Sequence, residues 1–74
     1  MEITKRKEKD VAIVAVSGRI DAITAPDFEK SLDELITAGD RVILIDLTAL
    51  GYISSAGLRS ILSSAKKLKA LSGE

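Results

Sequence analysis

Two apolar runs rich in β-branched residues constrain the fold of this chain more than any other feature. The first is Val11–Val16 (VAIVAV), and the second is Val42–Leu47 (VILIDL). Runs of this kind are typical of strands covered on both faces. A helical pattern separates them, and two strands joined through a helix form a right-handed βαβ unit with parallel strands. The sequence therefore predicts an α/β domain built around a parallel pair.

The segments around these runs complete the order of elements. Residues Glu2–Glu8 are rich in lysine, arginine and glutamate, which is typical of an edge strand, and Lys9-Asp10 is predicted as a turn. Residues 17–21 are expected to leave the sheet, and Thr48–Ile53 is expected to be a connecting loop. A second helix is predicted from about Ser55 to Leu71. The predicted order is ββαβα, a layered sheet with helices.

The first helix has clear start and stop signals. Thr24 is a preferred N-cap residue, Pro26 suits the first turn, and Gly39 is placed to end the helix. Ile23 and Phe28 have the spacing of a hydrophobic staple. Helical spacing predicts one apolar stripe on each helix: Phe28, Leu32, Leu35 and Ile36 on the first, and Leu58, Ile61, Leu62, Ala65, Leu68 and Leu71 on the second.

Composition excludes several classes of function. The 74 residues fit one small domain, without cysteine or histidine, so zinc, thiol and histidine-based chemistries have no residues to use. Eleven basic and eleven acidic residues balance, and only Phe28 and Tyr52 are aromatic, which argues against nucleic-acid binding. No apolar stretch approaches the roughly 20 residues of a membrane span. We expect a cytoplasmic domain with no cofactor, no metal, and no membrane or nucleic-acid partner.

The apolar strand Val42–Leu47 is expected to have an unprotected edge. A layered α/β domain normally continues with another strand beside it, and the chain contains no further strand after the second helix. An exposed apolar edge is a template for pairing with another chain. The sequence therefore predicts a homodimer formed through this edge, an exchange of elements, or a fragment of a longer domain.

The segment Tyr52–Leu58 (YISSAGL) places two hydroxyls where a strand ends and a helix begins. The first turn of a helix has unpaired N–H groups and a positive dipole end, which suits a phosphate. One reading is that a serine here only caps the helix. The other is that Ser54 caps while Ser55 presents its hydroxyl to a modifying enzyme. Gly57, inside the first turn, indicates either close approach of another group or tolerance near a helix end.

Two aspartates follow the strands at the same end of the predicted sheet. Because the carboxyl ends of parallel strands gather at one edge, Asp21, Asp46 and Ser54–Ser55 are expected to share one rim. An enzyme would use the aspartates to bind magnesium or to transfer protons. The alternative is that Asp21 steadies its loop and Asp46 ends its strand. The second reading is favoured, because no phosphate-binding glycine loop accompanies them.

Taken together, four segments resemble the STAS domain of bacterial anti-sigma factor antagonists. They are Gly18–Asp21 (GRID), the Thr24-capped helix, Val42–Thr48 and Tyr52–Arg59 (YISSAGLR). The resemblance covers nearly the whole chain and implies a single, partial STAS domain over residues 1–74, whose family fold continues with a further strand and helices. The family motif reads Asp-Ser-Ser/Thr/Ala-Gly-Leu, and the position of its aspartate is occupied here by Ser54.

The resemblance implies a phosphorylation switch rather than an enzyme. Ser55 matches the family serine that an anti-sigma factor serine kinase phosphorylates, and a separate phosphatase reverses the modification. The unphosphorylated antagonist binds that kinase and frees the sigma factor. The resemblance implies the following partner-binding residues: Asp21, Thr24, Ser54, Ser55, Ala56, Gly57 and Arg59.

Two other functions remain open from the sequence. STAS-like domains also serve as non-phosphorylated scaffolds in transporters and signalling assemblies, and Ser54 in place of the family aspartate leaves room for this. A small enzyme using Asp21 or Asp46 is a weaker hypothesis, because no nucleophile–base pair stands at a recognisable spacing.

Overall fold

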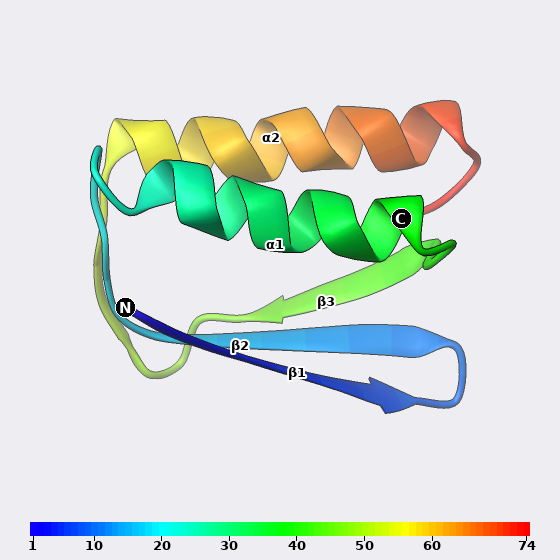
Figure 1. The fold of residues 1–74 in the computed structure, drawn as a ribbon, viewed down its shortest axis with the longest axis horizontal. Helices are drawn as coiled ribbons and strands as arrows, with labels where there is room; N and C mark the ends of the chain where they lie inside the picture. Colours follow the sequence, from blue (N-terminus) through cyan, green and yellow to red (C-terminus); the bar gives the residue numbers. More distant parts are fainter.

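Strand β2 (Val11–Ile20) is the centre of the sheet, because every other strand pairs with it. The computed structural model describes all 74 residues. Strand β1 pairs antiparallel to β2, while β3 and β4 pair parallel to successive stretches of it. Both helices lie on one face of the sheet (Figure 1). The remaining elements are β1 (Glu2–Glu8), α1 (Ala25–Thr37), β3 (Val42–Asp46), β4 (Leu50–Ile53) and α2 (Ser55–Ala70).

The structure confirms the α/β class and adds one strand to the predicted order, which becomes ββαββα. Residues 50–53, expected to be part of a loop, form β4, and β2 continues to Ile20 instead of leaving the sheet at residue 17. Gly18 has a φ of 89°, and the β2–β4 register shifts between Gly18 and Arg19. Glycine adopts this left-handed conformation without steric cost. Gly18 pairs with Leu50 and Arg19 with Tyr52, so Gly51 of β4 is the extra residue, and β4 bulges here and still pairs onward.

The core lies between β2 and α1. Strand alternation turns Val14 and Val16 towards the helices, and the apolar stripe of α1 packs onto them. The fully buried cluster consists of Val14, Val16, Ile20, Ala25, Phe28 and Leu32. Burial of Phe28, Leu32 and Ile36 confirms the stripe predicted for α1. The predicted staple is wrong, because the side chain of Ile23 is 86% exposed and cannot pack against Phe28.

The face that α2 buries differs from the predicted leucine stripe. Leu58, Leu62 and Leu71 are exposed. Within the predicted stripe, Leu68 is buried and Ile61 packs half-buried against the core. The other buried positions of α2 are Gly57, Ser60 and Ser64. Small side chains let α2 approach α1, and Ser60 satisfies its own hydroxyl by donating to the carbonyl oxygens of Ala56 (3.2 Å) and Ala25 (3.4 Å). The spacing of apolar residues alone does not reveal a helix–helix contact formed by glycine and serine.

Candidate partner-binding site at the start of the second helix

The two serines at the start of α2 have different roles. Ser54 is the N-cap residue, and its Oγ accepts a hydrogen bond from the N–H of Gly57 at 3.3 Å. The N–H of Ser54 donates to the carbonyl of Ile20 at 2.8 Å, which fixes the cap to the end of β2. Ser55 is the first helical residue, is exposed, and makes no side-chain hydrogen bond. Its hydroxyl is therefore free at the positive end of the helix dipole.

Gly57 permits the close approach of two core side chains. A Cβ atom at this position would lie 2.7 Å from Ile20 Cγ2 and 2.7 Å from Ile53 Cγ1. Both are branch atoms of isoleucines that cannot swing away without moving their strands. Of the two readings of this glycine, close approach is the one that the geometry favours. Gly57 is buried, so its contribution to the site is to hold Ser54 and Ser55 against the ends of β2 and β4.

Asp21 and Thr24 are bonded to one another in the loop that starts α1. The Oδ1 of Asp21 accepts from the N–H groups of Ile23 and Thr24, both at 3.0 Å. Thr24 Oγ1 accepts from the N–H of Asp21 at 2.9 Å. Thr24 occupies the predicted N-cap position, but its side chain makes no capping hydrogen bond because it is directed back to Asp21. Asp21 therefore stabilises its loop, which is the role that the non-catalytic interpretation predicted.

The hydrogen bonds in this loop should make stability depend on pH. Hydrogen bonds to its carboxylate lower the pKa of Asp21 below its ordinary value of about 3.9. The backbone N–H of Thr24 contributes most, and the backbone N–H of Ile23 and the hydroxyl of Thr24 contribute less. A carboxylate whose pKa is lower in the folded state than in the unfolded state stabilises the fold at pH values above its unfolded-state pKa. That stabilisation is lost as the pH falls through the folded-state pKa. Asp21→Asn is therefore expected to lower the melting temperature at pH 7, with the difference from wild type shrinking between about pH 5 and pH 3.

Thermal unfolding followed by circular dichroism across that pH range checks this expectation. Glu34→Gln is a matched control, because Glu34 is exposed and makes no side-chain hydrogen bond or ion pair. A melting-temperature difference for Asp21→Asn that stayed constant with pH would contradict the role given to the charge.

The structure does not bring Asp46 to the rim that Asp21 shares with Ser54. Residues Ile20 and Ile53 pair with each other, so Asp21 and Ser54, which follow them, are neighbours. Asp46 pairs with Ala15, five residues earlier on β2, or about 16 Å along the strand. Asp46 Oδ1 accepts from the hydroxyl (2.6 Å) and the N–H (3.0 Å) of Thr48, which also lowers its pKa. Asp46 ends its strand, and the two aspartates cannot act together.

One feature of the rim has no strong signal in the sequence. The guanidinium of Arg19 lies over the ring of Tyr52, with 4.3 Å between its Cζ and the ring centroid. Both residues are exposed and paired across β2 and β4, next to Asp21 and Ser54. A cation held over an aromatic ring is attracted to its face. This pair adds a positive charge and an aromatic ring to the surface at the ends of β2 and β4.

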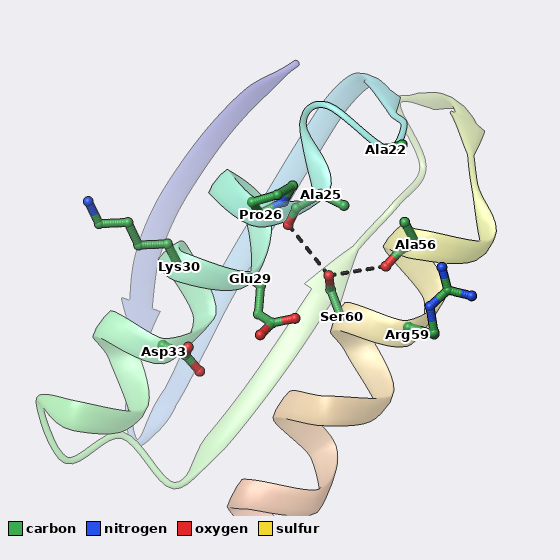
Figure 2. Close-up of a pocket in the computed structure, with 9 residues that line it drawn as sticks. All are labelled: Ala22, Ala25, Pro26, Glu29, Lys30, Asp33, Ala56, Arg59 and Ser60. Carbon is green, nitrogen blue, oxygen red and sulfur yellow. Dashed lines mark hydrogen bonds between the residues drawn. The ribbon is translucent and has the colours of Figure 1, made fainter.

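A polar groove runs between the N-terminal halves of α1 and α2 (Figure 2). Its volume is about 440 Å³, and Ala56 and Arg59 line it on the α2 side. Glu29 directs its carboxylate across the groove towards α2 in Figure 2. Asp33, at the α1 side, accepts a salt bridge from Lys67 of α2 at 2.8 Å. The remaining lining residues, none predicted from the sequence, are Ala22, Ala25, Pro26, Lys30 and Ser60.

The surface at the start of α2 combines polar, charged and aromatic groups. No three His, Cys, Asp or Glu side chains are grouped so that they could hold a metal ion. Neither helix is long and apolar enough to cross a membrane. The rim offers an exposed hydroxyl, the Arg19–Tyr52 pair and the charged groove at Arg59. A hydroxyl in this setting can accept a group from a separate enzyme.

Comparison with known proteins identifies the family. The STAS domain family model matches residues 2–74, and this chain belongs to that family. BtrV of Bordetella bronchiseptica is 36% identical over 74 residues, all of this chain and 64% of BtrV. The anti-sigma-F factor antagonist RsfB of Mycobacterium tuberculosis is 29% identical over 66 residues, 89% of this chain and 54% of RsfB.

A solved structure supports the same assignment. The crystal structure of an anti-sigma factor antagonist from Mycobacterium paratuberculosis superposes with a TM-score of 0.84 at 29% identity, covering 89% of this chain and 56% of that one. The chain is thus similar to regulatory proteins named as anti-sigma factor antagonists. It spans between about half and two thirds of the length of the relatives it matches.

Proposed function

We propose that this domain is an anti-sigma factor antagonist that is switched off by phosphorylation of Ser55. In its unmodified form it binds an anti-sigma factor serine kinase in the cytoplasm and so frees the sigma factor. The kinase transfers a phosphate from ATP to Ser55, the complex dissociates, and a phosphatase restores the active form. The single observation that carries this proposal is the division of roles between Ser54, which caps α2, and Ser55, whose exposed hydroxyl makes no bond in the fold.

The geometry explains how a phosphate could be accepted without unfolding the domain. A phosphoserine adds about −1.5 to −2 charges at neutral pH. At the first position of α2 that charge faces the positive end of the helix dipole. The first turn of α2 contains no acidic residue that would repel it. The modification is therefore compatible with the domain and acts on the surface that meets the partner.

The proposed partner surface surrounds Ser55. Residues Ala56 and Arg59 extend it along α2 into the groove, and the Asp21–Thr24 loop borders it on the other side. Ser54 and Gly57 contribute by fixing the start of α2, not by direct side-chain contact. This assignment keeps every residue expected from the family motif but divides them into contacting and supporting groups.

A second function is favoured by one observation, the serine at position 54 where the family motif has an aspartate. An uncharged cap changes the local charge that a kinase would meet. The domain would then be a STAS scaffold that binds its partner without being phosphorylated. An enzymatic role receives no such support, since Asp21 and Asp46 are separated and each is bonded to its own loop.

The test is incubation of the purified chain with ATP, magnesium and the anti-sigma factor kinase encoded nearest its gene, followed by peptide mass spectrometry. One phosphate on Ser55 is expected. Ser55→Ala should bind the kinase but incorporate no phosphate. Ser54→Ala is the matched control, which should lose about 1 kcal/mol of stability with its cap and still be phosphorylated. Binding of the kinase with no phosphate on any residue would instead support the scaffold.

A further inference from the structure

Arg59 lies one helical turn beyond the serine that is proposed to be phosphorylated. Residues four apart on an α-helix share one face, with about 5–6 Å between their Cβ atoms. Ser55 and Arg59 are both exposed residues of α2, so their side chains are neighbours on its surface. A phosphate on Ser55 would therefore lie within reach of the guanidinium group.

The direction of the Arg59 side chain favours this contact. Long side chains on an α-helix lean towards its N-terminus. Figure 2 shows the guanidinium of Arg59 extended towards the turn that carries Ala56, the residue next to Ser55. The order along the helix is also the favourable one, because it places the anion nearer to the positive end of the helix dipole and the cation one turn later.

Arg59 has no other partner in the fold. The other three arginines of the chain are each held by a contact within it: Arg6 by Glu8, Arg19 by the ring of Tyr52, and Arg41 by backbone carbonyl oxygens. The carboxylate of Glu29 points across the groove towards α2 but forms no salt bridge with Arg59. The guanidinium of Arg59 is thus free to bind an anion that arrives on Ser55.

Given the phosphorylation of Ser55 proposed above, on which this inference rests, we propose that Arg59 binds the phosphate and is thereby withdrawn from the partner surface. A guanidinium presents a planar fork of N–H donors that matches two phosphate oxygens, and a lysine cannot offer this geometry. In the unmodified chain the same donors remain available to the partner. Arginine is among the residues that most often dominate the binding energy of an interface.

This pairing gives the switch a change in the sign of its charge. A phosphoserine carries about −1.5 to −2 charges, so its pair with Arg59 retains a net charge of about −0.5 to −1. The partner then meets an anion where it met a free cation before. Glu29 and Lys30, which line the groove from α1, carry opposite charges and leave this reversal intact.

The test uses a chain with phosphoserine incorporated at position 55 during translation, so that no kinase is needed. Titration by ³¹P NMR measures the second pKa of the phosphate, which is about 6 in an unperturbed phosphoserine, and stays above about pH 5 to avoid the range in which carboxylates ionise. Arg59→Gln is expected to raise this pKa by at least about 0.3, because a bound guanidinium favours the dianion. Arg59→Lys should give an intermediate value, since it keeps the charge but loses the fork. The other charged groups of this face are the same in every variant: Arg19, Asp21, Glu29 and Lys30.

Lys66→Gln is the matched control. It removes one positive charge from an exposed position of the same helix that forms no salt bridge. The position lies about 16 Å from Ser55 along the helix axis, beyond the Debye length of about 8 Å at physiological ionic strength. The phosphate pKa of this variant should therefore equal that of the wild-type sequence.

The Nε–H signal of Arg59 in ¹H–¹⁵N spectra gives a second readout. It is expected to shift when the chain carries phosphoserine at position 55, because the guanidinium becomes hydrogen-bonded. An unmoved Arg59 signal, or equal phosphate pKa values with and without Arg59, would overturn the proposal and leave the helix N-terminus alone to hold the phosphate. Failure of the kinase to modify Ser55 would instead contradict the proposed function, and it would not change the result of this titration.

Discussion

The chain phosphorylated at Ser55 is expected to bind its kinase partner at least about thirtyfold more weakly than the unmodified chain. Burying a charged group in an interface without a partner costs about 2 kcal/mol or more, and 1.4 kcal/mol corresponds to a factor of ten in affinity. The phosphate would enter the centre of the proposed surface, between the Arg59 groove and the Asp21 loop. The melting temperature of the domain should change little, because the Ser55 hydroxyl makes no bond in the fold.

Isothermal titration calorimetry with the kinase in ADP, which prevents phosphate transfer, measures the two affinities. Ser55→Glu carries less charge than a phosphoserine and should cause a smaller loss in the same direction. Ala70→Glu places a negative charge at an exposed residue at the far end of α2, and this variant should bind as wild type does. Equal affinities for the phosphorylated and unmodified chains would exclude the switch, even if Ser55 accepts the phosphate.

Replacing Phe28 with alanine is expected to remove most of the stability of the domain. Phe28 is fully buried and is the largest residue of the core cluster. Truncation of a buried phenylalanine costs about 3–5 kcal/mol, through lost burial and the cavity left behind. A chain of 74 residues is stabilised by roughly 4–11 kcal/mol in total, at about 0.05–0.15 kcal/mol per residue.

Urea denaturation followed by circular dichroism measures this effect. Leu62→Ala is the matched control, because Leu62 is 62% exposed on α2 and its truncation should change stability by only about 0.5 kcal/mol. A loss below about 1 kcal/mol for Phe28→Ala would mean that the β2–α1 interface does not hold the domain together.

The parts of the fold that could be predicted from the sequence are those that follow apolar periodicity. The strands at Val11 and Val42 and the stripe on α1 were predicted because long runs and 3.6-residue spacing leave few alternatives. Strand β4 was missed because Leu50–Ile53 is short and pairs with β2 only through a bulge at Gly51, which no local sequence pattern predicts. The buried face of α2 was predicted at Leu68 but missed at Ser60 and Ser64, because their side chains are polar yet small enough to pack at a helix–helix contact.

The candidate site could also be predicted only in part from the sequence. The division between Ser54 as cap and Ser55 as exposed residue followed from helix-start rules, and the structure places both as expected. The pairing of Arg19 with Tyr52 and the groove beside Arg59 depend on contacts between distant segments. Such contacts exist only after β4 and the two helices have taken their places, so one-dimensional spacing could not reveal them.

The position of β2 has a consequence for how the domain comes apart. Every strand pair of the sheet includes β2, and the main core cluster takes Val14, Val16 and Ile20 from it. No group of elements that lacks β2 retains both a sheet and a core. The domain therefore contains no half that can stay folded while the other melts, and its unfolding is expected to be a single cooperative step.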